Sequence, residues 1–328
     1  MLATIEDKHS QQYPSTKLNL ERREIRLLEL LPGLKDQPIE GLLSIASLDD
    51  TPMYEALSYA WGSSSARKTI QLNQTEFAIT PNLQTALLHL RKEEKTRKLW
   101  VDAICINQDD PEEKQHQVQL MSKIYPDAQM VLCWLGPEED NSPFVINQIR
   151  ELAATVGTSD DESGSDEENS TSSDCSLSDP EESKRFMNNL FELLSRPWWS
   201  RLWTCQEFGL TLREPYLTCG NQQISWSIFY RVLTRKYEQL ISAILYSSNL
   251  ELNTATYWEK NEKLFHLLRV INLRTNQVPS FSLWKNHSLF EAVKNTRHYQ
   301  STDPLDKTFA VLSFLEEHHR ALFPPNYR

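Results

Sequence analysis

The amino-acid sequence predicts an α/β fold, with a central, mostly parallel sheet flanked by helices and a mainly helical C-terminal extension. Apolar runs of strand length alternate with amphipathic segments of helical period between residues 25 and 135. Two of these runs lie on either side of one predicted helix, which is the order of a right-handed βαβ unit. From residue 226 onward the pattern is mostly helical, with amphipathic stretches near 228–246 and 258–273. The alternation favours a parallel sheet, and the later residues favour a helical region beside it.

The first expected elements are two strands and a hairpin. Residues 25–31 (IRLLELL) and 54–61 (YEALSYAW) have the composition and length of strands. Residues 68–80 resemble a hairpin with Asn73 and Gln74 at its tip, where Gly would be more usual at the second position. We expect that difference to affect the type of turn and not the function.

Two nearly continuous apolar runs follow, at 99–106 (LWVDAICI) and 129–135 (QMVLCWL). Such runs are typical of central parallel strands, which are buried on both faces. Asp110 should cap a helix between them, with Pro111 in its first turn.

Apolar periodicity predicts the buried face of two helices. Thr80 should cap the earlier one, and Asp110 the later one. Apolar side chains recur at helical spacing in both segments, so each should bury one stripe. The expected buried residues are Leu83, Ala86, Leu87 and Leu90 in the first helix, and Val118, Met121 and Tyr125 in the second.

After residue 183 most expected elements are helical. They are helices at 184–194, 199–210 and from 303 to about 317, with a short strand at 215–220. We expect three regions: an N-terminal tail (1–19), an α/β domain (20–225), and a helical C-terminal region (226–328) packed on that domain.

The net charge of -11 is concentrated in one segment. Residues 157–183 contain ten acidic residues and no Lys or Arg, so about -1 is left for the rest of the chain. This Ser-rich, low-complexity segment has too few apolar residues to fold alone, and we expect a disordered loop insertion. Regulation by phosphorylation of its serines is the alternative.

Composition excludes several classes of protein. The remaining chain has no basic face, which disfavours direct binding of nucleic acid. No run of 18 apolar residues is present, so no membrane span is expected, and residues 1–15 lack the apolar core of a secretory signal. Five Cys without a CxxC pair indicate a reduced, cytoplasmic protein without a metal site.

Three segments combine large aromatic side chains with charged or amide side chains: 54–62 (YEALSYAWG), 99–110 (LWVDAICINQDD) and 196–207 (RPWWSRLWTCQE). Each begins or ends at the edge of an expected strand or helix. Ligands of open α/β sheets gather at the carboxyl ends of strands, so Asp102, Asn107 and Gln108 are well placed for binding.

These segments resemble the HET (heterokaryon incompatibility) domain family of filamentous fungi, in which YEALSYxWG, LWVDAICINQxD and RxWWxRxWTxQE occur in this order. The resemblance covers residues 20–220, and residues 303–312 (DPLDKTFAVL) resemble a segment that follows the domain in that family. It implies an intracellular module that triggers programmed cell death when it recognises a non-self partner. It also implies partner proteins and self-association on activation.

HET domains are in turn similar to TIR domains, which implies a TIR/flavodoxin-like sheet. Residues 54–59 resemble the first TIR strand, and residues 203–207 (WTCQE) resemble the TIR segment in which an aromatic residue and a Glu flank a helix start. In enzymatic TIR domains that Glu cleaves the nicotinamide–ribose bond of NAD. The resemblance therefore implies that Glu207 is a catalytic carboxylate, with NAD as substrate and no cofactor.

The chemistry fits the residue types. Departure of nicotinamide leaves an oxocarbenium-like ribose, which a carboxylate stabilises, while aromatic rings stack on the bases. The candidate substrate-binding residues are Tyr59, Trp61, Gly62, Asp102, Asn107, Arg201 and Trp203. No GxxxxGK[ST] or GxGxxG phosphate loop is present, so Gly62 is only a weak substitute.

Each candidate also has a structural explanation. Glu207 could pair with Arg201 or Arg196 merely to close the domain, the tryptophans could pack in the core, and Asp102 could cap a loop. A filled core beside Glu207 would favour a non-enzymatic signalling module. An open cleft lined by Trp61, Asp102 and Trp203 would favour the enzyme.

Overall fold

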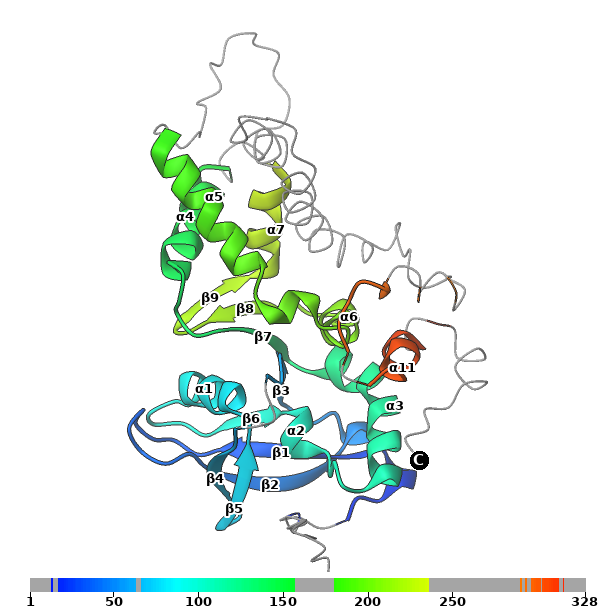
Figure 1. Cartoon of the computed structure of the whole chain (residues 1–328). Helices are drawn as coiled ribbons and strands as arrows, with labels where there is room; N and C mark the ends of the chain where they lie inside the picture. The colour runs from blue at the N-terminus through cyan, green and yellow to red at the C-terminus, as the bar shows by residue number, and fades with distance from the viewer. Residues whose placement is uncertain are drawn as a thin grey trace, which may run out of the picture.

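The computed structural model describes residues 13, 17–62, 66–156, 180–235, 290, 293, 296–301, 303–312 and 315, which form one large sheet flanked by helices (Figure 1). The strands are β1 (Glu24–Leu30), β2 (Glu40–Ser47), β3 (Glu55–Tyr59), β4 (Lys68–Leu72), β5 (Thr75–Ile79), β6 (Arg97–Trp100), β7 (Met130–Gly136), β8 (Tyr216–Cys219) and β9 (Gln222–Ser225). They form a 9-stranded sheet in the order β5-β4-β2-β1-β6-β3-β7-β8-β9.

The sheet is mixed, and the expectation of a mostly parallel sheet is wrong. The pairs β2·β4, β3·β6, β3·β7 and β7·β8 are parallel, whereas β1·β2, β1·β6, β4·β5 and β8·β9 are antiparallel. Short connections explain the antiparallel hairpins, because a parallel pair needs a long crossover. Strand β2, which the sequence pattern did not predict, supplies one of these antiparallel partners.

The helices are α1 (Pro81–Leu90), α2 (Asp102–Cys105), α3 (Pro111–Asp127), α4 (Ser142–Val156), α5 (Pro180–Leu194), α6 (Thr204–Gly209), α7 (Trp226–Arg235) and α11 (Asp306–Leu312). Three 3-10 turns are η1 (Leu20–Arg22), η2 (Leu48–Asp50) and η3 (Pro197–Ser200). Helices α4, α5 and α7 pack together beside β8 and β9, whereas α6 contacts α3, α11 and the central strand β3 (Figure 1).

Two helix starts are confirmed. The Thr80 side chain accepts a hydrogen bond from the Leu83 backbone N–H, and Asp110 accepts from those of Glu112 and Glu113. Pro occupies the first turn of both helices, where its missing N–H costs nothing. The expected apolar stripes of both helices are buried: Leu83, Ala86, Leu87 and Leu90 in α1, and Val118, Met121 and Tyr125 in α3.

The predicted hairpin is confirmed as β4 and β5. Asn73 and Gln74 at its tip have φ of 49° and 65°, so both central residues adopt the left-handed conformation of a type I′ turn. Gln74 thus accepts a backbone conformation that Gly would adopt more easily. The Asn73 side chain also accepts a hydrogen bond from the Leu43 backbone N–H at 2.9 Å, which ties the turn to β2.

Two expected elements are corrected in part. Residues 99–106 are not one strand, because β6 ends at Trp100 and Asp102–Cys105 form α2. A continuous apolar run suits a buried strand and a buried helical turn equally. Residues 199–210 are likewise not one helix: η3 and an extended Arg201 precede α6.

Several predictions fall partly or wholly outside the described residues. Residues 157–179 of the acidic segment, most of the N-terminal tail and the helix expected near 258–273 are among them. Residues 180–183 of the acidic segment are described, and they begin α5, so the expectation of disorder is wrong for these four residues. The division into three regions therefore stays a prediction. Within the described part of the chain, no helix combines the length and apolar character needed to cross a membrane.

Candidate functional site

An open cavity of about 730 Å³ lies at the carboxyl ends of β3 and β6. These strands are parallel neighbours, so the residues that follow them meet at one edge of the sheet. Six lining residues carry the argument: Trp61, Asp102, Lys114, Arg201, Trp203 and Asp306. Trp61, Asp102 and Trp203 therefore line an open cleft, but Glu207, beside which such a cleft would favour the enzyme, is absent from its lining.

Arg201 joins the three aromatic segments. Its Nη1 donates hydrogen bonds to the backbone carbonyl of Tyr59 at 2.8 Å and to Glu207 Oε1 at 2.7 Å. Its Nη2 lies 3.4 Å from Asp102 Oδ2. Asp102 also accepts a hydrogen bond from Trp61 Nε1 at 2.7 Å, which fixes that indole ring on the cavity wall.

Glu207 lies behind this wall. Its exposed fraction is 0%, it is absent from the cavity lining, and Arg201 stands between it and the cavity. The Ser58 hydroxyl donates to Glu207 Oε2, and Trp198 Nε1 donates to Ser58 Oγ at 2.9 Å. Of the two arginines that the sequence offered as partners, the structure pairs Glu207 with Arg201.

Burial controls the electrostatics of these groups. Burial raises the pKa of Glu207 to about 7. The Arg201 cation lowers this pKa, but its effect is smaller than that of burial, and the Asp102 carboxylate raises the pKa further. Burial lowers the pKa of Arg201, but the carboxylates of Glu207 and Asp102 outweigh this effect and raise it, so the guanidinium stays charged. Burial also raises the pKa of Tyr59 well above its ordinary value, which keeps the phenol neutral.

The other candidates divide between the cavity and its surroundings. Gly62 lines the cavity with a φ of 74°, a left-handed conformation that favours Gly. Trp203 lines it too, and its Nε1 donates to Asp306 Oδ2 at 2.9 Å. Tyr59 has an exposed fraction of 1% and is absent from the lining, so its contribution is the backbone carbonyl that Arg201 binds.

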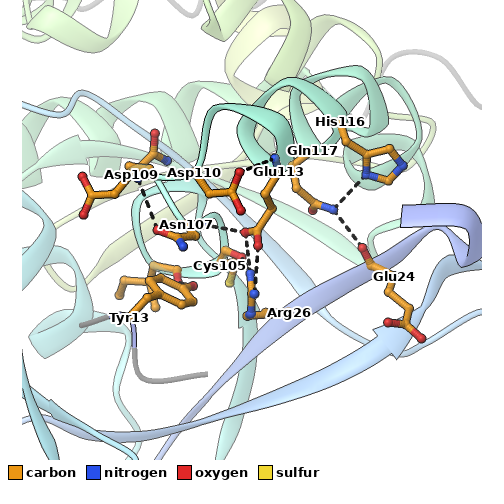
Figure 2. A network of polar contacts seen from close by, with 12 residues as sticks. Tyr13, Glu24, Arg26, Cys105, Asn107, Asp109, Asp110, Glu113, His116 and Gln117 are labelled. Carbon is orange, nitrogen blue, oxygen red and sulfur yellow. Dashed lines mark hydrogen bonds and ion pairs between the residues drawn. The ribbon is translucent and has the colours of Figure 1, made fainter. Parts of the chain in front are cut away.

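Asn107 lies outside the cavity lining, contrary to the expectation that it accompanies Asp102. Its neighbours Ile106 and Gln108 do line the cavity. The Asn107 backbone N–H donates to Glu113 Oε1 at 2.7 Å, and its side chain accepts from the Asp109 backbone N–H at 3.2 Å. Asn107 thus belongs to a second polar network at the start of α3 (Figure 2).

The second network is centred on Arg26 and Glu113 (Figure 2). Arg26 donates to the two carboxylate oxygens of Glu113 at 2.6 and 3.0 Å, and both side chains are almost fully buried. The guanidinium lies 4.7 Å from the centre of the Tyr13 ring and donates to the Cys105 carbonyl at 3.3 Å. This network binds β1 to α3, so we assign it to stability.

Sequence reasoning gave no site role to Ser58, Asn82 or Asp306. Asn82 donates to the Ala60 carbonyl at 2.5 Å and accepts from Trp134 Nε1 at 3.0 Å, which positions the chain that leads to Trp61. Asp306 lies in the segment 303–312. The resemblance of this segment to one that follows the domain in the HET family was the available sequence signal for its importance. Its distance along the chain from the other motifs concealed the contact with Trp203.

Among the described residues, no group of three or more His, Cys, Asp and Glu side chains could hold a metal ion. Cys105, Cys133, Cys205 and Cys219 are buried. Burial raises the pKa of Cys205 to about 12 and that of Cys105 to about 12, which disfavours the thiolate form of both.

The raised pKa of Glu207 gives a prediction for stability. Between the ordinary value of 4.5 and about 7, the folded state holds a proton that the unfolded state has lost. The free energy of unfolding should therefore fall as pH rises through this window, by up to about 1.4 kcal/mol per pH unit. Glu207→Gln should lack this fall in the free energy of unfolding. Urea unfolding of both proteins at several pH values tests it, and parallel profiles would contradict it.

Comparison with known proteins gives two findings. Residues 54–207 match the protein family described as Heterokaryon incompatibility protein (HET). The chain is also 33% identical over 246 residues to "Heterokaryon incompatibility protein 6, OR allele" of Neurospora crassa, and this alignment covers 65% of the chain. It spans only 35% of that relative. No solved structure is significantly similar to this chain. Both matches are to heterokaryon incompatibility proteins.

Proposed function

On the premise of HET-family membership, which the match over residues 54–207 supports, we propose that this protein acts in heterokaryon incompatibility. It is an effector that triggers cell death on recognising a non-self partner, and it self-associates when activated. The similarity to the Neurospora crassa incompatibility protein supports this role.

The proposed activity is hydrolysis of NAD in the cavity. The observation that carries this proposal is that the three aromatic segments meet at one open cavity, with Trp61 and Trp203 on its wall and the Asp102–Arg201–Glu207 chain beside them. A volume of about 730 Å³ is within the usual range of small-molecule sites. Indole rings supply stacking surfaces for the nicotinamide or adenine ring.

In the proposed reaction the bond between ribose and nicotinamide breaks, and its electron pair leaves with the nicotinamide. Water adds to the ribose carbon and loses a proton. A carboxylate stabilises the positive charge that develops on the ribose. Asp102 is the carboxylate that the three aromatic segments place on the cavity wall, whereas Glu207 touches a substrate only if the Arg201 side chain moves aside.

A non-enzymatic signalling module is the second candidate function. Full burial of Glu207 and its ion pair with Arg201 favour it, because both fit a carboxylate that holds α6 against β3. In that case the module acts by self-association or by recruitment of partner proteins.

Nicotinamide release from NAD by the purified protein separates the two functions. We expect turnover in the wild type and a loss of about 100-fold or more in Glu207→Gln and in Asp102→Asn. Asp36→Asn, at an exposed position outside the cavity lining, is the control and should keep full activity.

Two results would contradict the proposed reaction or the role of Glu207 in it. Equal turnover in Glu207→Gln and wild type would exclude a catalytic role for Glu207. No turnover in protein that has been shown to self-associate would exclude the activity itself. Cell death that survives both substitutions in an expression assay would then identify the signalling module.

A further inference from the structure

A C-terminal segment, residues 300–301 and 303–306, is far along the chain from the three aromatic segments and completes the cavity wall. The Gln300 backbone N–H donates to the Ser200 carbonyl at 2.6 Å, and the Leu202 N–H donates to the Gln300 carbonyl at 2.8 Å. Gln300 thereby forms a parallel bridge with Arg201. In Figure 1 the α11 helix that follows lies beside α6. This C-terminal segment lies beyond residues 54–207, so it is separate from the family match.

The C-terminal segment brings two carboxylates to the cavity. Asp303 and Asp306 both line it. Asp306 accepts the hydrogen bond from Trp203 Nε1 at 2.9 Å, and Asp303 accepts one from the Leu305 backbone N–H at 2.9 Å. Trp203 and Asp306 repeat, on this side of the cavity, the pairing that Trp61 and Asp102 make at the end of β3.

The charges of the lining are unequal. Among the residues that the structure describes, the cavity is lined by three carboxylates, those of Asp102, Asp303 and Asp306, and by two cations, those of Lys114 and Arg201. Arg201 is already held by two carboxylates, at 2.7 Å from Glu207 and 3.4 Å from Asp102. Two indole rings with a surplus of carboxylates favour a positively charged, planar group, because the face of an indole attracts cations.

We propose that Asp303 and Asp306 determine the specificity of the cavity, by selecting a ligand that carries a planar cationic ring of the pyridinium type. The proposal rests on the proposed binding of NAD in this cavity. It deepens that function, since the ring of oxidised NAD is a pyridinium cation whereas the ring of the reduced form is neutral. Asp306 also positions Trp203, so charge and stacking surface come from the same contact.

The test compares two probes that differ in ring charge. Binding of 1-methylnicotinamide, a pyridinium cation, and of neutral nicotinamide is measured by titration calorimetry. We expect the wild type to bind the cation at least ten-fold more tightly. The variant Asp303→Asn/Asp306→Asn should lose this preference, because asparagine keeps an acceptor for Trp203 and for the Leu305 N–H but removes both charges.

The matched control removes two charges elsewhere. Asp36→Asn/Asp50→Asn changes two exposed carboxylates outside the cavity lining and should keep the preference. Circular dichroism establishes that each variant is folded. Equal affinity of the wild type for the two probes, binding of neither probe, or a preference that survives in Asp303→Asn/Asp306→Asn would overturn the proposal.

The outcome is distinguishable from that of the NAD assay. Cleavage of NAD without a preference for the cationic probe would leave the enzyme standing and remove the acidic selection. A preference for the cationic probe without cleavage of NAD would leave the selection by Asp303 and Asp306 standing and remove the enzyme activity. Weaker binding of reduced than of oxidised NAD to wild-type protein, lost in the same double variant, would extend the result to the intact dinucleotide.

Discussion

Replacing Arg26 with Met is expected to lower the free energy of unfolding by about 3–5 kcal/mol, because it leaves the Glu113 carboxylate buried without its partner. The exposed fractions of the two side chains are 1% and 3%. Glu113 would keep the hydrogen bond from the Asn107 N–H but lose both contacts with the guanidinium. The Cys105 carbonyl would also lose a donor.

Arg23 provides the matched control. It pairs with Asp49, but the exposed fractions there are 47% and 50%, so Arg23→Met should cost less than about 1 kcal/mol. Urea unfolding at pH 7 measures both variants. Adding Glu113→Leu to Arg26→Met should recover part of the loss, since an apolar pair leaves no buried charge. Equal costs at Arg26 and Arg23 would refute the assignment.

Much of the fold could be predicted because its signals are local. The cap at Thr80, the cap at Asp110 and the apolar spacing behind each depend on residues within two turns. Strand β2 lacked such a signal, because Gly41 and exposed apolar side chains such as Leu42 interrupt its alternation. Its place in the sheet depends on pairing with β1, which no local pattern records.

The candidate site could be predicted only where strand ends determine position. The end of β3 and the end of β6 bring Trp61 and Asp102 to one cavity, as the rule for parallel strands predicts. Asn107 was expected there too, but only its neighbours Ile106 and Gln108 line the cavity, while the Asn107 side chain accepts a hydrogen bond from the Asp109 N–H. Asp306 contributes through a contact of long sequence separation, for which neither spacing nor composition gave evidence.

Arg201→Met is expected to be the most damaging substitution at the candidate site, with a loss of about 3–5 kcal/mol at pH 8. Arg201 is the donor that Glu207, Asp102 and the Tyr59 carbonyl share, and its side chain has an exposed fraction of 15%. Without it, two carboxylates face each other beside a buried tyrosine. The NAD hydrolysis proposed for the cavity should be lost with it.

The loss in free energy of unfolding caused by Arg201→Met should be smaller at lower pH. This pH dependence shows whether Arg201 neutralises a titrating carboxylate, that of Glu207, or only packs against its neighbours. The Arg201 cation lowers the pKa of Glu207, so its removal should raise that pKa above about 7. Near pH 5.5 Glu207 is then protonated in the folded variant, which removes one of the two charges that Arg201 neutralised.

Arg196 is the control for this pH dependence. It is a buried arginine of the same segment, but it donates mainly to the backbone carbonyls of Leu135, Pro137 and Glu139. Carbonyls do not titrate, and the Asp140 carboxylate that lies 3.9 Å from Arg196 Nη2 is 54% exposed, so Arg196→Met should cost a similar free energy at pH 5.5 and at pH 8. If Arg201→Met behaved like Arg196→Met, the Glu207 carboxylate would not be the group that Arg201 neutralises. The electrostatic chain from Glu207 to the cavity would then be refuted.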